Sequence, residues 1–205
     1  GSVNSADELQ ELPYCRGQET QEYNVVEARL RPGVRFDLER LRRNVFTSSS
    51  CGVCGKASLE AVAFSGCTDL EDELRVEGAL LPGLPDTLLE GQGVFARTGG
   101  LHAAGLFWAD GEICELREDV GRHNAVDKVL GRALLDRKLP ADDRILVVSG
   151  RASFEIVQKA LMARVPVLVA VGAPSSLAVD LSEEFGQTLV GFVRDDGFNV
   201  YCGNE

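Results

Sequence analysis

Residues 144–171, RILVVSGRASFEIVQKALMARVPVLVAV, decide the fold of this chain. The stretch begins and ends with continuous apolar runs, and its middle part, 153–163, has apolar residues at helical spacing. Two short apolar runs joined by a helix predict neighbouring parallel strands that are buried on both faces. The pattern continues with a helix and two strands, over residues 175–185, 188–193 and 198–201. We therefore expect an α/β fold in three layers, with a largely parallel sheet.

The segments before this core predict smaller elements. Residues 101–119 alternate between apolar and polar on either side of Ala109-Asp110-Gly111, which predicts a hairpin. Helices are expected over 121–136 and 86–95. We divide the chain into an N-terminal strand and helix region, a cysteine loop and a sandwich domain, over residues 1–46, 47–60 and 61–205.

The composition restricts the function. The 205 residues carry a net charge of -11, which argues against general binding to nucleic acid or to a membrane surface. No apolar run is long enough to span a membrane and the N-terminus lacks a signal peptide, so we expect a cytoplasmic protein. The six cysteines show no disulfide framework, in keeping with a reducing compartment. The opening Gly-Ser without a Met is what a truncated form would have.

Cys51 and Cys54 form a C-x-x-C pair within TSSSCGVCGKASLE, residues 47–60. The serines and glycines around the pair predict a mobile, exposed loop. The spacing puts two sulfur atoms within reach of each other, of one metal ion, or of one transferred sulfur atom. If the loop folds back, Lys56 and the arginines at 40–43 could lower the pKa of a thiol there.

Four chemistries use such a pair. A structural zinc site needs four ligands, and the other cysteines and histidines are scattered singly, so zinc is a weaker alternative and we predict no metal site. A thioredoxin-like pair would lie early in a βαβ unit, whereas this pair precedes that unit. Zinc deaminase chemistry is excluded, because Ser50 precedes Cys51 and no H-x-E or C-x-E triplet occurs. A nucleophilic or sulfur-carrying thiolate remains.

Polar residues also gather where predicted helices begin. His123 lies in Gly121-Arg122-His123-Asn124, at the start of a helix, and Lys128 follows one turn later. Because backbone N–H groups at a helix start attract anions, this cluster predicts a site for a phosphorylated or otherwise anionic ligand.

Three further strand ends carry polar or charged residues, and the first two of them lead into predicted helices. Arg151 follows the strand at 144–148, and open α/β sheets bind ligands at such ends. Ser153 is expected to cap the following helix rather than to contact a ligand. The turn 172–176 brings two serine hydroxyls to the next helix start, and Arg194 follows the third strand. We expect the two turns at 150–153 and 172–176 to form a nucleotide-sized pocket along one edge of the sheet.

Five motifs, in this order, resemble those of the FdhD family, the formate dehydrogenase accessory sulfurtransferases. They are SCGVCGK, DVGRHNAVDK, SGRASFEIVQKA, GAPSSLAV and LVGFVRDDGFNVY, and they cover residues 47–202. The resemblance implies an α/β/α sandwich similar to that of the cytidine deaminases, which agrees with the strand and helix pattern. It also implies a homodimer. The family usually has a further N-terminal segment that we do not find here, so the chain resembles an N-terminally truncated member.

The resemblance further implies a sulfurtransferase. Family members take sulfur from a cysteine desulfurase as a persulfide and pass it to a molybdenum or tungsten bis-molybdopterin guanine dinucleotide, which formate dehydrogenase then receives. Cys51 matches the persulfide cysteine, and Cys54 matches the second cysteine, which would assist transfer or resolve the persulfide. The family's cofactor-binding stretch matches Phe192, Val193, Arg194, Asp195, Asp196 and Gly197.

From the argument about helix starts, we add four residues to the guanine-dinucleotide pocket: Arg151, Ser175, Ser176 and His123. A guanine nucleotide could mimic the cofactor there. The alternative function is a non-enzymatic chaperone that binds the molybdenum cofactor, in which Cys51 need not carry sulfur.

Overall fold

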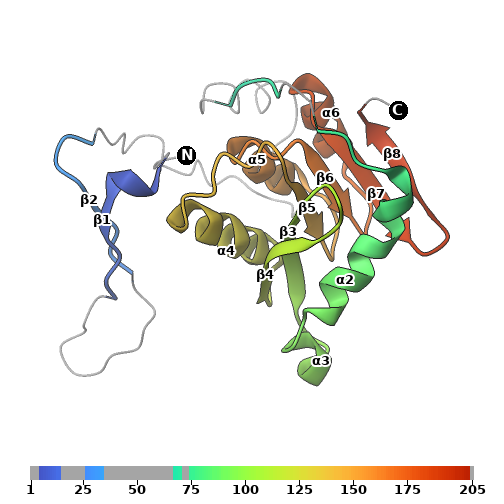
Figure 1. Ribbon diagram of the computed structural model, residues 1–205, viewed down its shortest axis with the longest axis horizontal. Coiled ribbons are helices and arrows are strands. Elements are labelled where there is room, and N and C mark those ends of the chain that lie inside the picture. Colours follow the sequence, from blue (N-terminus) through green and yellow to red (C-terminus); the bar gives the residue numbers. More distant parts are fainter. Residues whose placement is uncertain (1–4, 15–25, 35–66, 71–73, 204–205) are drawn as a thin grey trace.

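The computed structural model describes residues 5–14, 26–34, 67–70 and 74–203. Its main feature is a six-stranded sheet with the strand order β4-β3-β5-β6-β7-β8 (Figure 1). The strands are β3 (His102–Phe107), β4 (Ile113–Asp119), β5 (Ile145–Val148), β6 (Val167–Ala170), β7 (Thr188–Arg194) and β8 (Gly197–Cys202). The helices are η3 (Gly78–Gly83), α2 (Leu84–Glu90), α3 (Phe95–Thr98), α4 (Arg122–Leu135), α5 (Phe154–Met162) and α6 (Ser176–Glu184).

Only the centre of the sheet is parallel. β5, β6 and β7 pair in parallel, because α5 and α6 return the chain to the same end of the sheet between them. β3 pairs antiparallel with both β4 and β5, and β8 pairs antiparallel with β7 after the turn Asp195–Asp196. The predicted hairpin at 101–119 is confirmed, but the sheet is mixed rather than largely parallel, because hairpins add the strands at both of its sides.

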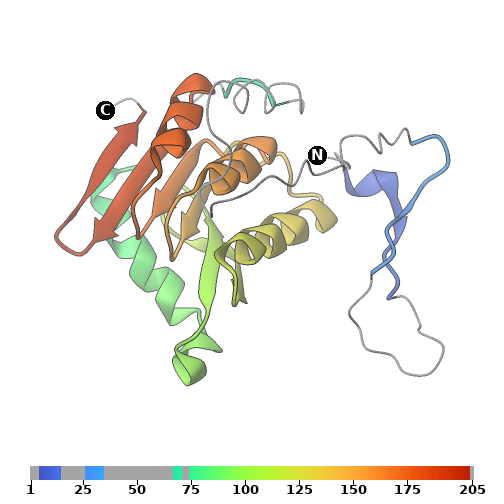
Figure 2. The ribbon, with the colours of Figure 1, turned by 180° about the vertical axis from the view of Figure 1, so that it is seen from behind.

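Helices cover both faces of the sheet, which confirms the three-layer α/β/α sandwich. α4, α5 and α6 pack on one face, which Figure 2 shows in front. α2 and η3 pack on the other face, against Phe107, Ile145 and Val169 among others. Every residue of β5 and β6 is buried, because both faces of these central strands are covered.

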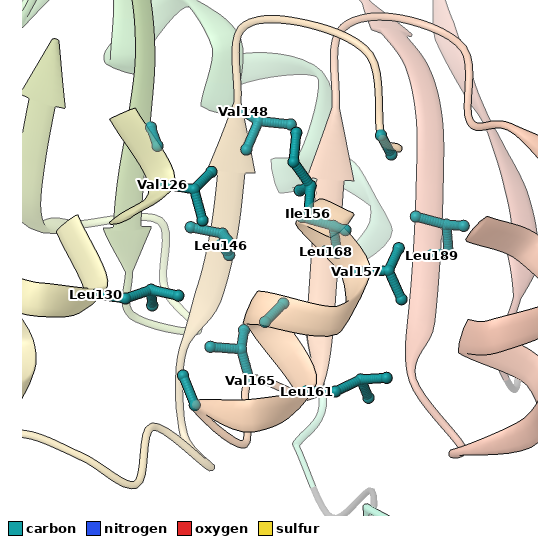
Figure 3. Close-up of a cluster of buried hydrophobic side chains, with 14 of the residues drawn as sticks. Val126, Leu130, Leu146, Val148, Ile156, Val157, Leu161, Val165, Leu168 and Leu189 are labelled. Carbon is teal, nitrogen blue, oxygen red and sulfur yellow. The ribbon is translucent and has the colours of Figure 1, made fainter. Parts of the chain in front are cut away.

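The larger core lies between the sheet and α4, α5 and α6 (Figure 3). Leu146 and Leu168 point from the sheet into this layer and are fully buried. They meet residues of the helices that recur at helical spacing, among them Val126, Leu130, Ile156, Val157 and Leu161. This packing holds the ends of β5, β6 and β7 in fixed positions relative to one another.

The N-terminal residues form a separate two-stranded sheet beside the sandwich (Figure 1). It consists of β1 (Leu9–Glu11) and β2 (Arg29–Leu30), which pair antiparallel, and follows the short helix η1 (Ala6–Glu8). An ion pair of 2.7 Å joins Asp7 to Arg137, just after α4. The cysteine loop at 47–60 and the expected domain boundaries on either side of it fall outside the described residues.

The helix expected over 86–95 differs from the one observed. α2 begins at Leu84, because Pro85 suits the first turn of a helix, and it ends before Gly91. Gly91 and Gly93 lie between the end of α2 and the separate short helix α3, so the expected single helix is broken there. None of the helices in the described part of the chain is long and apolar enough to cross a membrane.

Candidate functional site at one edge of the sheet

The loops that follow β5 and β6 lie beside each other and beside the end of β7. The backbone N–H of Gly172 donates to the carbonyl of Gly150 over 2.9 Å, and that of Ser175 donates to Ala152 over 3.0 Å. The N–H of Phe192 in turn donates to the carbonyl of Gly172 over 3.3 Å. These bonds join the two predicted ligand-binding turns and the end of β7 into one continuous surface, which we call the carboxyl edge.

The start of α4 belongs to the same edge. His102 begins β3 and Asp119 ends β4, and the two residues are paired across the hairpin. Because β3 runs antiparallel to β5, His102 lies near the end of β5, where the N–H of Ser149 donates to the carbonyl of Ala103 over 3.0 Å. Arg122 follows Asp119 after a short turn. The carboxyl edge is therefore made by the loops 149–153 and 171–175, the end of β7 at 191–194, His102, Asp119 and the first turn of α4.

Two glycines let these loops approach closely. A Cβ on Gly172 would lie 2.9 Å from Cγ of Arg151 and 3.1 Å from its backbone N and Cα. A Cβ on Gly191 would lie 2.9 Å from Pro174 and 3.0 Å from the ring of Tyr201. Side chains do not fit at either position, so both glycines are needed for the edge to be continuous.

His123 is the best-defined side chain of the predicted pocket. Its Nε2 lies 2.9 Å from Oγ of Ser153 and 3.2 Å from Oε2 of Glu155, at the start of α5. Burial lowers the pKa of His123 and outweighs the opposing effect of Glu155, while Arg122 and Lys159 lower it further. The imidazole is therefore neutral at pH 7, and the carboxylate assigns its proton to Nε2.

This His–Ser–Glu group differs from a hydrolase triad. In a triad the carboxylate contacts one ring nitrogen and the serine contacts the other. Here Glu155 and Ser153 share Nε2 of His123, so this nitrogen cannot take a proton from Ser153 while it donates to Glu155. The group therefore lacks the triad's separate contacts to the two ring nitrogens.

Ser153 and Ser175 both occupy the N-cap of a helix, but only Ser175 makes a capping hydrogen bond. Ser153 occupies the N-cap of α5, as expected, but its hydroxyl contacts His123 instead of a backbone N–H of the helix, so the expected capping bond is wrong. Ser175 caps α6 by accepting from the N–H of Ala178 over 3.2 Å. Ser176, the first residue of α6, is exposed.

Most polar groups of the cluster at the start of α4 bind the carboxylate of Asp119 rather than being free for a ligand. Its Oδ1 accepts from the N–H of Gly121 over 2.9 Å and from Nδ2 of Asn124 over 3.0 Å, and its Oδ2 pairs with Lys128 at 2.6 Å. These contacts, first of all the one with Lys128, lower the pKa of Asp119 to about 2. Asn124 and Lys128 are thus occupied, and His123 contacts Ser153 and Glu155, so that among the described residues Arg122 is the member of the predicted anion cluster without a hydrogen-bond partner.

The stretch 192–197 extends from the carboxyl edge as the end of the β7–β8 hairpin. Phe192 has φ of 54° and is 40% exposed, an unusual backbone for an aromatic residue. Val193 is buried in the core, so its side chain packs against the sheet. Arg194, Asp195 and Asp196 are exposed. Within the described ranges, these three side chains form no hydrogen bond or ion pair with another residue.

The C-x-x-C pair, Cys51 and Cys54, lies outside the described residues. The described cysteines, Cys67, Cys114 and Cys202, are free thiols, and burial raises the pKa of each. Within the described ranges, no three His, Cys, Asp or Glu side chains gather in a way that could hold a metal ion.

Three residues of the carboxyl edge are not among the site residues predicted from the sequence: His102, Ser149 and Asp119. Oγ of Ser149 accepts from the N–H of Ala103 over 2.9 Å and lies 3.4 Å from Nδ1 of His102. Ser149 directly follows the strand at 144–148, which is the same signal that pointed to Arg151. His102 lies beside Ser149 because β3 pairs antiparallel with β5. The sequence pattern does not predict this pairing.

Comparisons with known proteins agree with this architecture. The FdhD/NarQ family matches residues 1–205, beyond the stretch that the five motifs cover. The sulfur carrier protein FdhD of Streptomyces avermitilis is 56% identical over 210 residues, which cover 100% of this chain and 74% of that protein. The protein of that name from Mycobacterium tuberculosis is 50% identical over 208 residues, or 98% of this chain and 75% of that protein.

A solved structure has the same fold. It is described as a formate dehydrogenase accessory protein from Desulfotalea psychrophila, and it matches 100% of this chain and 73% of its own with a TM-score of 0.72 and 26% identity. The match along the whole chain and the identities of half or more mean that this chain belongs to the FdhD/NarQ family.

Proposed function

We propose that this chain is a sulfur carrier in the maturation of formate dehydrogenase, and that it carries the sulfur as a persulfide on Cys51. The shared name of its relatives, sulfur carrier protein, is the observation that supports the proposal most directly. The description of the structural neighbour points to the same dehydrogenase. The C-x-x-C pair supplies the thiols.

The first step loads the carrier. The Cys51 thiolate attacks the outer sulfur of a persulfide on a cysteine desulfurase. The S–S bond of the donor breaks, a new S–S bond forms on Cys51, and the donor cysteine leaves as a thiolate. No net electrons are exchanged, since one persulfide replaces another. Burial raises the pKa of each of the described cysteines, so those three thiols are poorly suited to this step.

The second step delivers the sulfur to the acceptor. Release as sulfide requires two electrons, which Cys54 supplies when its thiolate attacks Sγ of Cys51. The outer sulfur leaves as sulfide for the metal of the acceptor, and Cys51 and Cys54 remain as a disulfide. A cellular dithiol then reduces this disulfide and restores the carrier. The two intervening residues of a C-x-x-C pair allow this bond.

The acceptor in this proposal is a molybdenum or tungsten bis-molybdopterin guanine dinucleotide, bound at the carboxyl edge. Arg151 is exposed there, beside the turn that carries Ser175 and Ser176. Phe192 presents an aromatic side chain from a strained backbone position, and such strain is typical of ligand sites. A cytoplasmic homodimer is the form in which we propose that the carrier works.

The alternative is a chaperone that binds the cofactor without carrying sulfur, and it is favoured by the absence of an activated nucleophile among the described residues of the edge. One experiment separates the two functions. In cells that lack their own member of this family, wild-type protein restores formate dehydrogenase activity, and Cys51→Ala fails to do so although the variant is present in equal amount. Restoration by Cys51→Ala would support the chaperone and exclude the persulfide route.

A further inference from the structure

The end of the β3–β4 hairpin presents an aromatic side chain to solvent, at the edge of the sheet opposite the carboxyl edge. We call this side, where β5, β6 and β7 begin, the amino edge; β3 ends there because it pairs antiparallel with β5. Trp108 is the only tryptophan of the chain, directly follows β3 and is 41% exposed. Ile113, at the start of β4, is 39% exposed. Tryptophan is among the residues that most often dominate the binding energy of protein interfaces.

This hairpin end is held in one conformation. The N–H of Trp108 donates to the carbonyl of Glu112 over 2.9 Å, and the N–H of Gly111 donates to the carbonyl of Trp108 over 3.0 Å. Oδ1 of Asp110 accepts from the N–H of Glu112 over 3.0 Å. The guanidinium of Arg144 lies 3.0 Å from the centroid of the Trp108 ring, and its side chain is only 13% exposed. A side chain that is fixed in advance loses little conformational entropy when a partner binds it.

The exposed charges beside the ring are negative. Asp110 and Glu112 are exposed, and within the described ranges neither carboxylate pairs with a cation. Arg144, the cation under the ring, is already paired with Asp143. The hairpin end therefore combines an apolar ring with two carboxylates, in a chain of net charge -11. A second copy of this chain would be repelled, whereas a protein with an apolar pocket bordered by lysines or arginines is complementary.

The chain that follows the cysteine loop is attached at the same edge. Oγ1 of Thr68 accepts from Nη1 of Arg164 over 2.9 Å, and Nε of Arg164 donates to Oδ1 of Asp142 over 2.7 Å. Asp142 lies two residues before Arg144, on which the ring of Trp108 lies. The segment 67–70 is thus joined to the surroundings of the exposed tryptophan through one arginine.

The chain that precedes the cysteine loop is attached there as well. β2 is the last described strand before the loop, and its sheet is joined to the sandwich by the ion pair between Asp7 and Arg137. Arg137 follows α4, which ends at the amino edge because the chain then enters β5. Both described flanks of the loop that holds Cys51 therefore reach the edge that carries Trp108. A protein that reacts with Cys51 gains most from a docking surface at this edge.

We propose that the end of the β3–β4 hairpin, residues 108–113, is the docking surface for the sulfur donor. Trp108 enters an apolar pocket of the donor, and Asp110 and Glu112 face basic side chains around that pocket. The inference rests on the proposed function, since the donor is the cysteine desulfurase that loads Cys51. Docking at the amino edge leaves the carboxyl edge open, so donor and acceptor use different surfaces of the carrier.

The test compares two sulfur sources in loading Cys51, measured by intact-protein mass spectrometry. One source is a cysteine desulfurase with cysteine, which has to dock. The other is glutathione persulfide, whose outer sulfur the Cys51 thiolate attacks while glutathione leaves as a thiolate. Trp108→Ala raises the carrier concentration that gives half-maximal loading by the desulfurase about tenfold or more, and it leaves loading by glutathione persulfide unchanged.

A second variant tests the charges without removing the ring. Glu112→Lys keeps the turn, because only the backbone of Glu112 takes part in its hydrogen bonds. It weakens loading by the desulfurase, most strongly at low salt, since the basic side chains of the donor then meet a positive charge. Val200→Ala, which shortens an exposed apolar side chain of β8, is the matched control and loads from both sources as wild type does.

Binding is measured directly by fluorine NMR with fluorotryptophan in the carrier, which gives one signal because the chain has one tryptophan. Unlabelled desulfurase shifts or broadens this signal in wild type, and does so much less in Glu112→Lys. A signal that stays unchanged at saturating desulfurase overturns the proposal. A signal that changes with carrier concentration alone assigns the hairpin end to a second copy and also overturns it.

The loading assay can overturn the proposal in two further ways. The desulfurase may load Trp108→Ala and Glu112→Lys as well as wild type, or Trp108→Ala may be slowed equally with both sulfur sources. If neither source loads wild-type Cys51, the sulfur-carrier function fails instead, and the fluorine signal still decides whether the desulfurase docks at the hairpin end. The two failures are therefore told apart.

Discussion

Asp119→Asn tests how the structure positions the start of α4. The carboxylate of Asp119 accepts hydrogen bonds from Gly121 and Asn124 and forms an ion pair with Lys128. These contacts fix the turn that leads to Arg122 and His123. Its pKa is lowered from 3.8 to about 2. Each pKa unit is worth about 1.4 kcal/mol, which gives an upper limit of about 2.5 kcal/mol for the charged form.

Solvent reduces this value. The side chain of Asp119 is 18% exposed and that of Lys128 is 50% exposed, so the ion pair is partly screened. We expect Asp119→Asn to lower the free energy of unfolding by about 1.5 kcal/mol at pH 7. Because the pKa is lower in the folded protein, the carboxylate stabilises the fold above about pH 4. This stabilisation decreases as the pH falls from about 4 to about 2, and about half of it remains near pH 3.

The assay is urea unfolding of wild type and Asp119→Asn at about pH 7 and about pH 3. Asp180→Asn, an exposed aspartate on α6, serves as the matched control and changes the free energy by less than about 0.5 kcal/mol. The reasoning is refuted if Asp119→Asn is as stable as the control at pH 7. It is also refuted if the loss is as large at pH 3 as at pH 7, because the effect would then not depend on the charge.

Three further predictions concern packing and thiols. Leu168→Ala removes a fully buried side chain from the larger core and lowers the free energy of unfolding by about 3 kcal/mol in urea titrations, and a loss under about 1 kcal/mol would contradict the packing. Gly172→Ala brings a methyl group against the backbone of Arg151 and costs about 1–3 kcal/mol by the same measurement, whereas Gly93→Ala, where a Cβ meets nothing, does not. Iodoacetamide labels Cys67, Cys114 and Cys202 slowly in the native protein at pH 7, because burial raises the pKa of each thiol. Peptide mass spectrometry measures this labelling, and a rate like that of free cysteine at any of the three would contradict the raised pKa of that thiol.

The sequence predicted those strands and helices whose apolar residues recur in a clear pattern. β5, β6 and the helices α4, α5 and α6 all appear where apolar spacing placed them, since each buries a continuous apolar run or stripe. The directions of the outer strands were not predictable in the same way. Apolar alternation indicates that a strand exists but does not say which neighbour it pairs with, and β3 proved to pair with both β4 and β5.

At the site, the positions of the turns were predictable from the sequence, whereas the partners of the polar side chains were not. The turns at Arg151 and Ser175 lie side by side as expected, because parallel strands end at the same edge. The partners of polar side chains were harder to predict. Asn124 and Lys128 turn to Asp119, and Ser153 turns to His123, because each finds a stronger partner on a neighbouring element than in its own helix.

The most direct test of the sulfur-carrier proposal is intact-protein mass spectrometry after incubation with a cysteine desulfurase and cysteine. The account predicts a gain of one sulfur atom that a reductant removes, that is lost in Cys51→Ala and that persists in Cys202→Ala. Absence of the gain with an active desulfurase, or an equal gain in Cys51→Ala, would contradict the claim that Cys51 carries the sulfur.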